Sequence, residues 1–163
     1  MKPLTEKEIR AAFVNCSKGE AKRLNLPRDL AERPWDDLDY LGWRDPQAPD
    51  RAYLVAEVDG RPQGLVLRGA PHVAGQARRS MCRICMTTKE GGVTLMVAPL
   101  AGPAGKQGNS VGVYLCTDLD CSLYVRGIKQ VEGMMKVPES LTVEEKIART
   151  VANLEAFLAK VTH

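Results

Sequence analysis

The stretches MCRICMTTKEGG (Met81–Gly92) and YLCTDLDCSLY (Tyr114–Tyr124) hold four of the five cysteines in this chain of 163 residues. The cysteines are spaced as Cys82-x-x-Cys85 and Cys116-x-x-x-x-Cys121. Two such pairs in one small chain can be a disulfide framework, a redox dithiol, a metal site or a coincidence of packing. The choice among these four largely decides the chemistry available to the protein.

Length and charge set the first limits. The chain is long enough for one domain with a real hydrophobic core. Its formal net charge of +3 permits contact with an acidic surface but does not by itself indicate nucleic acid. The N-terminal sequence MKPLTEKEIR lacks an apolar signal core, and no stretch approaches the roughly 18 apolar residues of a membrane helix. We therefore expect a cytoplasmic protein without membrane association, in which thiols stay reduced and structural disulfides are disfavoured.

A capping box predicts the first helix. The side chain of Thr5 can accept a hydrogen bond from the backbone of Glu8, and Glu8 can reach back to Thr5. The apolar residues that follow have helical spacing: Ile9, Ala12, Phe13 and Cys16. We expect this helix to end near Gly19, with Cys16 as a packing residue on its apolar face.

A second capping box, Thr142 to Glu145, predicts a terminal helix. The apolar residues after it have a period suited to an amphipathic helix: Ile147, Val151, Leu154 and Leu158. We expect this helix at about 140–161.

Strands are expected between these helices. Residues 52–58 and 64–68 read as a hairpin around Asp59-Gly60, and Pro62 favours a loop longer than two residues. Before the hairpin, the residues from Trp35 to Trp43 are expected in a short helical turn and a loop. After it, residues 72–79 are expected as a loop or short helix.

Residues 93–98 and 111–115 are expected as two further strands. The connection LAGPAGKQGNS (residues 100–110) is expected to be an exposed, mobile loop because it is rich in glycine. A helix capped by Thr117 or Asp118 is expected to run to about Lys129. The fold class is therefore α+β, with a small antiparallel sheet and flanking helices.

One domain spanning residues 1–163 accounts for this order. Its expected parts are a helical and β-hairpin part at about 1–78, a cysteine module at about 79–130, and the terminal helix.

The order of elements favours a structural zinc site. The Cys82-x-x-Cys85 turn can present two thiolates to one ion, and the following hairpin brings the chain back to Cys116 and Cys121. The Cys82-x-x-Cys85 turn (the first knuckle), the hairpin and the start of a helix follow one another in the order of a treble-clef zinc finger. A redox dithiol or a disulfide, iron–sulfur ligation and coincidental packing remain as alternatives.

Four thiolates would fill a tetrahedron and leave no position for an activated water, so we expect a non-enzymatic protein with one structural zinc and no small-molecule substrate. The histidines, His72 and His163, are expected at the surface rather than as ligands. No stretch has the Gly-Lys-Ser/Thr pattern of a phosphate loop, and no nucleophile–base pair is evident.

Basic residues near the cysteines support one alternative function, RNA or ribosome binding by a phosphate-tracking patch. The residues of this patch are Arg78, Arg79, Arg83, Lys89, Lys106, Arg126 and Lys129. Five of them (Arg78, Arg79, Arg83, Arg126 and Lys129) could also screen the charge of a thiolate site. A thiol oxidoreductase using Cys82 and Cys85 is the less favoured alternative.

The stretch from Met81 to Gly127 resembles a known family. MCRIC, the strand and glycine-rich loop, and VGVYLCTDLDCSLYVRG are similar to the C-terminal treble-clef domain of the elongation factor G-binding proteins, the FusB type associated with fusidic acid resistance. Upstream, IRAAFVNCSKGEAKRLNLP and WDDLDYLGWRDP resemble the compact actinobacterial-type members that carry this domain alone. The resemblance covers roughly residues 3–130.

The resemblance implies a zinc-bound fold that docks on elongation factor G and promotes its release from the ribosome. By position, the resemblance assigns the role of zinc ligand to four residues: Cys82, Cys85, Cys116 and Cys121. It also places contacts to the factor around the first knuckle and along the loop and strand before the third cysteine, at Arg83, Ile84, Lys106, Gln107, Ser110 and Tyr114.

Overall fold

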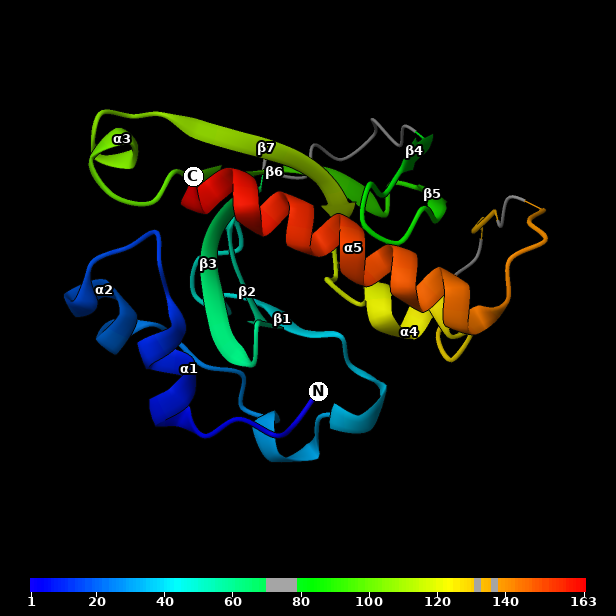
Figure 1. The fold of residues 1–163 in the computed structure, drawn as a ribbon, viewed down its shortest axis with the longest axis horizontal. Helices are drawn as coiled ribbons and strands as arrows, with labels where there is room; N and C mark the ends of the chain where they lie inside the picture. Colours follow the sequence, from blue (N-terminus) through cyan, green and yellow to red (C-terminus); the bar gives the residue numbers. More distant parts are fainter. Residues whose placement is uncertain (70–78, 131–132, 136–137) are drawn as a thin grey trace.

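A computed structural model describes residues 1–69, 79–130, 133–135 and 138–163 of the chain (Figure 1). Its α-helices are α1 (Glu6–Ala12), α2 (Lys18–Arg23), α3 (Pro103–Lys106), α4 (Cys121–Val125) and α5 (Val143–Thr162), with 3-10 turns η1 (Leu30–Glu32) and η2 (Trp35–Asp37). Its strands are β1 (Tyr40–Arg44), β2 (Arg51–Val58), β3 (Arg61–Gly69), β4 (Arg79–Met81), β5 (Thr88–Glu90), β6 (Val93–Pro99) and β7 (Ser110–Cys116). The α+β class is confirmed.

Five strands form an antiparallel sheet in the order β1-β2-β3-β6-β7, and β4 pairs with β5 beside it. Successive side chains of a strand point to opposite faces of a sheet. On β2, Leu54 joins the hydrophobic core under α5, whereas Tyr53 and Val55 join a second core with α1. The sheet is therefore a middle layer between α5 and the N-terminal helices (Figure 1).

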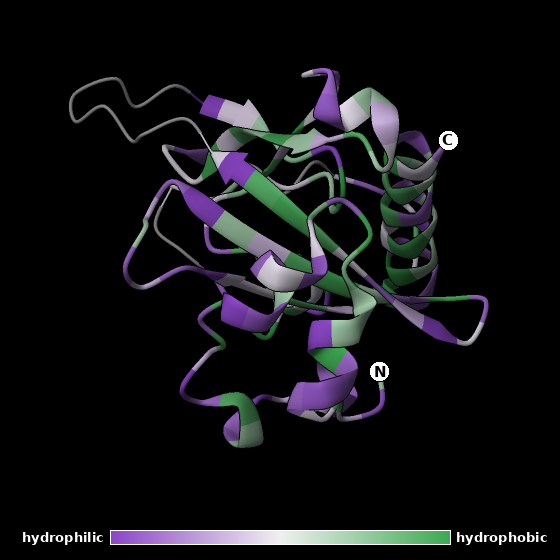
Figure 2. Ribbon diagram, turned by 90° about the vertical axis from the view of Figure 1, so that its left-hand side faces the viewer, coloured by the Kyte–Doolittle hydropathy of each residue, from purple (hydrophilic) through white to green (hydrophobic). Residues whose placement is uncertain are grey.

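The terminal helix α5 covers one face of the sheet, and its predicted capping box is present at Thr142. Its inward residues are buried in the main core: Leu154, Phe157, Leu158 and Val161. Figure 2 shows the hydrophobic side of this helix toward the sheet and its hydrophilic side outward. Within the described residues, no helix is both long and apolar enough to cross a membrane.

The first helix is shorter than predicted. Its capping box at Thr5 is present and Ile9 is buried, but α1 ends at Ala12. Phe13 is extended and forms a bridge with Gly64, so the prediction of one apolar helical face through Cys16 was wrong. A further capping box, Ser17 to Glu20, begins α2. That Ser-x-x-Glu pattern is the sequence signal that would have separated the two helices.

The hairpin turn also differs from the prediction. Val58 pairs with Arg61, so β2 and β3 are joined by the two residues Asp59 and Gly60, with φ of 51° and 74°. Both residues are left-handed, as a type I′ turn requires. Pro62 fits in the strand because it lies next to the closing pair of the hairpin, at a position whose N–H would not bond to β2. The expectation of a longer loop was therefore wrong.

Strand β1 was not predicted. The helical turn at Trp35–Asp37 was expected, but residues 40–44 form an edge strand instead of a loop. Tyr40 to Trp43 are buried on both faces of the sheet, so they show no alternation in sequence. Gly42 has a packing role, because a Cβ there would lie 2.6 Å from the Cβ of Leu119. The edge strand thereby contacts the chain between the last two cysteines.

The connection between β6 and β7 contains the short helix α3. Most of its residues are exposed, as predicted, and its mobility stays a prediction. The helical turn was not expected. It closes tightly at Gly105, where a Cβ would lie 1.8 Å from the carbonyl oxygen of Leu100.

Two other expectations concern single segments. The helix after Cys116 is shorter than predicted, since α4 ends at Val125 and its N-cap is Asp120 rather than Thr117 or Asp118. The loop or short helix expected at 72–79, including His72 and Arg78, falls almost entirely outside the described residues.

Candidate metal centre

The four cysteines of the two pairs converge on one point. Their sulfur atoms all lie within 4.8 Å of one another, and all four side chains are buried. The Sγ atoms of Cys82 and Cys121 are 3.6 Å apart, and those of Cys85 and Cys116 are also 3.6 Å apart. The cluster therefore joins the first knuckle to the end of the β6-β7 hairpin.

The first two cysteines are held by a tight turn between β4 and β5. The N–H groups of Ile84 and Cys85 donate to the Sγ of Cys82 at 3.4 and 3.5 Å. The turn closes at Met86, whose φ is 61°, and the N–H of Cys82 donates to the carbonyl of Thr87 at 2.9 Å. Backbone amides aimed at a sulfur favour its thiolate form.

The second pair is placed by the end of a strand and the start of a helix. Cys116 is the last residue of β7 and Cys121 the first of α4. Between them the chain reverses at Leu119, whose φ is 61° and whose N–H donates to the carbonyl of Cys116 at 2.9 Å. The four-residue spacing of this pair is thus the length of one compact turn.

This donor set fits zinc. A tetrahedral ion with Zn–S bonds of about 2.3 Å requires sulfur atoms about 3.8 Å apart. The two 3.6 Å separations are close to that edge length, and four sulfur donors are the set that structural zinc sites use. The four cysteines are positioned to bind one zinc ion.

The charges within the cluster also call for a cation. Interaction with the neighbouring thiols, Cys116 first, lowers the pKa of Cys82 and of Cys85, whereas burial raises the pKa of Cys121. Four buried thiols in contact cannot all ionise without a bound cation. Nearby, the buried Tyr40 hydroxyl has no hydrogen-bond partner among the described residues, and its pKa is raised by burial and then by the charge of Cys121. A metal-bound thiolate would be an acceptor for that hydroxyl.

Charged side chains enclose one side of the centre. Lys89 is buried, with its Nζ 3.5 Å from the centroid of the Tyr124 ring and 3.9 Å from a carboxylate oxygen of Asp118. The Nζ of Lys129 is 3.1 Å from Asp118 and 2.5 Å from Asp120. Two lysines and two aspartates thus surround the turn between Cys116 and Cys121.

A bidentate ion pair ties α4 to the start of β1. The two guanidinium nitrogens of Arg126 donate to the carboxylate of Asp39 at 2.7 and 2.8 Å, and both side chains are largely buried. Such paired, charge-assisted bonds fix orientation as well as distance. The helix that carries Cys121 is therefore anchored to the main sheet.

The family described as FBP C-terminal treble-clef zinc-finger matches residues 8–161. The chain belongs to this family. The match extends beyond the cysteine knuckle, the hairpin and the helix start, and it covers nearly the whole chain, from α1 to α5. No curated protein and no solved structure gives a match to it.

Most of the residues that the resemblance assigned to partner contact lie at the surface of the protein. Tyr114 is 46% exposed, and Arg83, Lys106, Gln107 and Ser110 are also exposed. The N–H of Arg83 donates to the carbonyl of Tyr114 at 2.8 Å, so the knuckle touches the edge of β7. Lys106 and Gln107 lie at the other end of that strand, on and after α3.

Ile84 is placed differently. Its side chain is 1% exposed and belongs to the main core, so it has no surface to offer a partner. Its carbonyl accepts a hydrogen bond from the Asn153 side chain of α5 at 3.0 Å. Ile84 thus anchors the knuckle to the terminal helix.

Several basic residues of the possible RNA patch are buried or paired with acidic side chains. Lys89 is buried, Arg126 pairs with Asp39, and Lys129 pairs with two aspartates. Arg79, Arg83 and Lys106 are exposed. Cys82 and Cys85, the pair considered for thiol chemistry, are 0% and 4% exposed.

Sequence reasoning missed one surface residue beside Tyr114. Leu95 of β6 is the cross-strand partner of Tyr114 and is 39% exposed. The alternation of residues 93–98 would have placed Leu95 outward once the register with β7 was known. That register depends on the length of the turn around α3, which the glycines did not indicate.

Proposed function

We propose that this protein is a non-enzymatic binding module of the cytoplasm that docks on elongation factor G and promotes the release of the factor from the ribosome. The family supports this proposal through the kind of module it describes. In the structure, the supporting observation is an exposed aromatic and aliphatic pair beside an exposed arginine. We call this region the β7 surface: Arg83, Leu95, Lys106, Gln107, Ser110 and Tyr114.

The β7 surface has the composition of a protein-binding site. Tyr114 and Leu95 are cross-strand partners and are both exposed. A Cβ at Gly112 would lie 3.0 Å from the Cδ1 atom of Leu95, so the glycine leaves room for the Leu95 side chain. Tyrosine and arginine are enriched among the residues that contribute most to protein–protein binding. An exposed lysine, Lys106, and an exposed arginine, Arg83, lie at its two ends and suit a partner with acidic groups.

Zinc would act here as a rigid support. Cys82 and Cys85 flank Arg83 in the knuckle, and Cys116 ends the strand that carries Tyr114. An ion bound by all four thiolates fixes the knuckle against that strand and so keeps Arg83 beside Tyr114. A preorganised surface binds more tightly because less side-chain and loop freedom is lost on docking.

Titration calorimetry with purified elongation factor G from the same organism tests the proposal. The wild-type protein should bind, and Tyr114→Ala or Arg83→Glu should weaken binding by roughly tenfold or more. Glu155→Lys, a charge reversal at an exposed position of α5, should leave binding unchanged. Zinc content and circular dichroism of each variant show whether the fold is retained.

Absence of heat for the wild type at tens of micromolar would overturn the proposal. Binding to ribosomal RNA that weakens steeply with salt would instead favour the RNA function. The structure gives that alternative less support, because three of its basic residues are engaged in internal contacts: Lys89, Arg126 and Lys129.

A further inference from the structure

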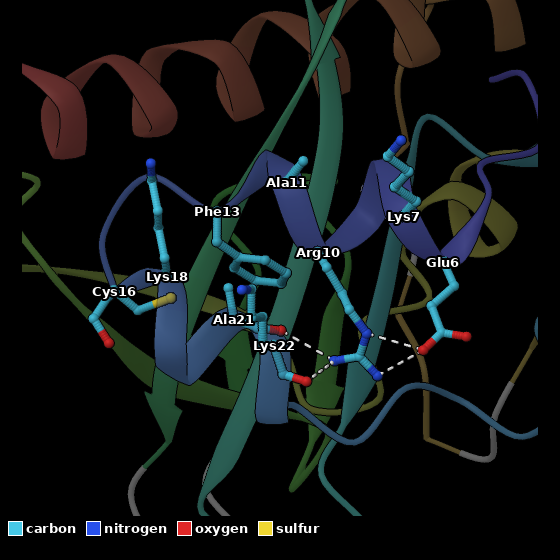
Figure 3. Close-up of a pocket in the computed structure, with 10 residues that line it drawn as sticks. Glu6, Lys7, Arg10, Ala11, Phe13, Cys16, Lys18, Ala21 and Lys22 are labelled. Atoms are coloured by element: carbon cyan, nitrogen blue, oxygen red, sulfur yellow. Dashed lines mark hydrogen bonds and ion pairs between the residues drawn. The ribbon is translucent and has the colours of Figure 1, made fainter.

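A groove of about 710 Å³ lies between α1 and α2, away from the cysteine cluster (Figure 3). Its floor is apolar and includes Phe13, Cys16 and Ala21. Its volume falls within the range of about 300–1,000 Å³ that is typical of ligand sites. Neither the zinc site nor the β7 surface requires a groove at this place, so it needs its own explanation.

The groove is held open by one arginine. The Arg10 side chain donates to the carbonyls of Ala21, Lys22 and Leu24 at 2.9–3.0 Å, and also to the carboxylate of Glu6 at 2.9 Å. These carbonyls belong to the C-terminal end of α2, where helix carbonyls lack partners within the helix. Arg10 therefore fixes the distance between α1 and α2 (Figure 3).

The floor of the groove is equally fixed. The Phe13 ring packs edge-on against Trp43 and Tyr53, with centroid distances of 6.4 and 6.0 Å. Burial raises the pKa of the Cys16 thiol to about 11, so at neutral pH this thiol is protonated and adds to the apolar surface. The packing of the Phe13 ring and the protonated state of the Cys16 thiol both indicate a preformed apolar site.

The rim of the groove is basic. Lys7, Lys18 and Lys22 line it, are exposed, and form no ion pair with any residue in the described ranges. Its one carboxylate, Glu6, is bound to Arg10. An adjoining hollow of about 450 Å³ shares Cys16 and Ser17 and is lined by both Glu20 and Lys106. The rim thus offers positive charge on both sides of an apolar floor.

We propose that the α1–α2 groove binds an acidic amphipathic segment of a protein partner, with apolar side chains against Phe13 and Cys16 and carboxylates beside the rim lysines. Helical segments commonly bind apolar grooves in this way, through residues spaced three and four apart. A polar small molecule fits less well, because the Nε and Nη1 donors of Arg10 already bond to Glu6 and to the carbonyls of Ala21, Lys22 and Leu24. The inference does not depend on which protein the β7 surface binds.

A synthetic peptide tests this. The probe is a fluorescein-labelled amphipathic peptide of about 16 residues, roughly four helical turns, with an apolar stripe flanked by glutamates. Fluorescence anisotropy should show saturable binding that weakens as salt is added. The same peptide with lysines in place of glutamates should bind roughly tenfold more weakly or not at all.

Variants locate the peptide. Ala11 is exposed and lines the groove, so Ala11→Glu should weaken binding by roughly tenfold or more. Lys18→Glu combined with Lys22→Glu should weaken it similarly and reduce the salt dependence. The matched control is Ala156→Glu at an exposed position of α5, which should bind like the wild type. Arg83→Glu should also leave peptide binding unchanged, which separates this groove from the β7 surface.

A second readout does not depend on these variants. Cys16 lies on the groove floor, so bound peptide should slow its alkylation by N-ethylmaleimide several-fold in the zinc-loaded wild type. Absence of binding, equal binding of the lysine peptide, or unchanged alkylation with peptide bound would overturn the proposal. So would binding to anionic lipid vesicles without binding to the peptide, or dimerisation of the wild type that Ala11→Glu abolishes.

Discussion

The Nζ atom of Lys89 lies 3.5 Å from the centroid of the Tyr124 ring, although the lysine is only 2% exposed. A buried ammonium group is costly unless opposite charge or a π face compensates it. Here the Tyr124 ring and the Asp118 carboxylate provide that compensation. Four thiolates and one Zn²⁺ would sum to −2 (−4 + 2), and Lys89 would supply one positive charge from β5, the strand that follows the Cys82–Cys85 turn.

Lys89→Met should therefore destabilise the zinc-loaded protein. The substitution keeps the aliphatic length of the side chain but leaves the charge of the centre and Asp118 less compensated. We expect a loss of about 1–2 kcal/mol in the free energy of unfolding, measured by urea denaturation with zinc in excess. Lys106→Met, at an exposed position, is the control and should change little. Equal stability of Lys89→Met and wild type would show that the buried cation does not support the centre.

Removal of zinc should unfold the cysteine module. Because binding of a structural metal is coupled to folding, Cys116→Ser should lose the metal and the ordered structure around residues 79–127. Cys16→Ser should keep both, since Cys16 lies outside the cluster. Elemental analysis should give one zinc per chain for the wild type and for Cys16→Ser. A folded, metal-free wild type with intact thiols would contradict the assignment.

The rate of alkylation of Cys16 should rise at a higher pH than that of an ordinary thiol. Burial, and then the charge of Glu20, raises the pKa of this thiol to about 11. Because the thiolate is the reacting form, its reaction with iodoacetamide should stay slow at pH 8 and rise steeply up to about pH 11. The rate–pH profile of the zinc-loaded protein, followed by mass spectrometry, measures this. A midpoint near the ordinary value of about 8.5 would mean that the thiol is solvated.

Gly42→Ala should be strongly destabilising. A Cβ at this position would lie 2.6 Å from the Cβ of Leu119 and 2.9 Å from the Tyr40 ring, so β1 or the cysteine turn must shift. We expect a loss of about 2 kcal/mol or more in thermal or urea unfolding. Gly19→Ala, within α2, is the comparison, because alanine favours a helix by about 0.5–1 kcal/mol over glycine. A Gly42→Ala variant as stable as wild type would contradict the close contact between β1 and the turn.

The cysteine centre could be predicted from the sequence because its ligands are marked by residue type and spacing, and the strands around 93–98 and 111–115 set where the chain returns. The end helices were predicted because each has a capping box before an apolar period. Two of the failures depended on tertiary contact. Phe13 leaves the helix to pair with Gly64, and β1 is hidden because both of its faces are buried.

The residues that the resemblance assigned to partner contact were also predicted only in part. Tyr114 and Arg83 were placed by resemblance and lie side by side, joined by a backbone hydrogen bond. Ile84 was placed with them, but the turn between Cys82 and Cys85 directs it into the core. Neighbouring residues of a tight turn point in different directions, and a one-dimensional pattern does not distinguish them.

Hydrogen–deuterium exchange of the protein with and without elongation factor G, at concentrations where calorimetry detects binding, tests the central claim most directly. Docking through the β7 surface predicts slower exchange in the peptides covering the knuckle at 82–85, strand β6, and residues 106–114. Peptides from α5 should exchange at the same rate in both samples. Protection confined to α5, or no change anywhere in the chain, would contradict the account.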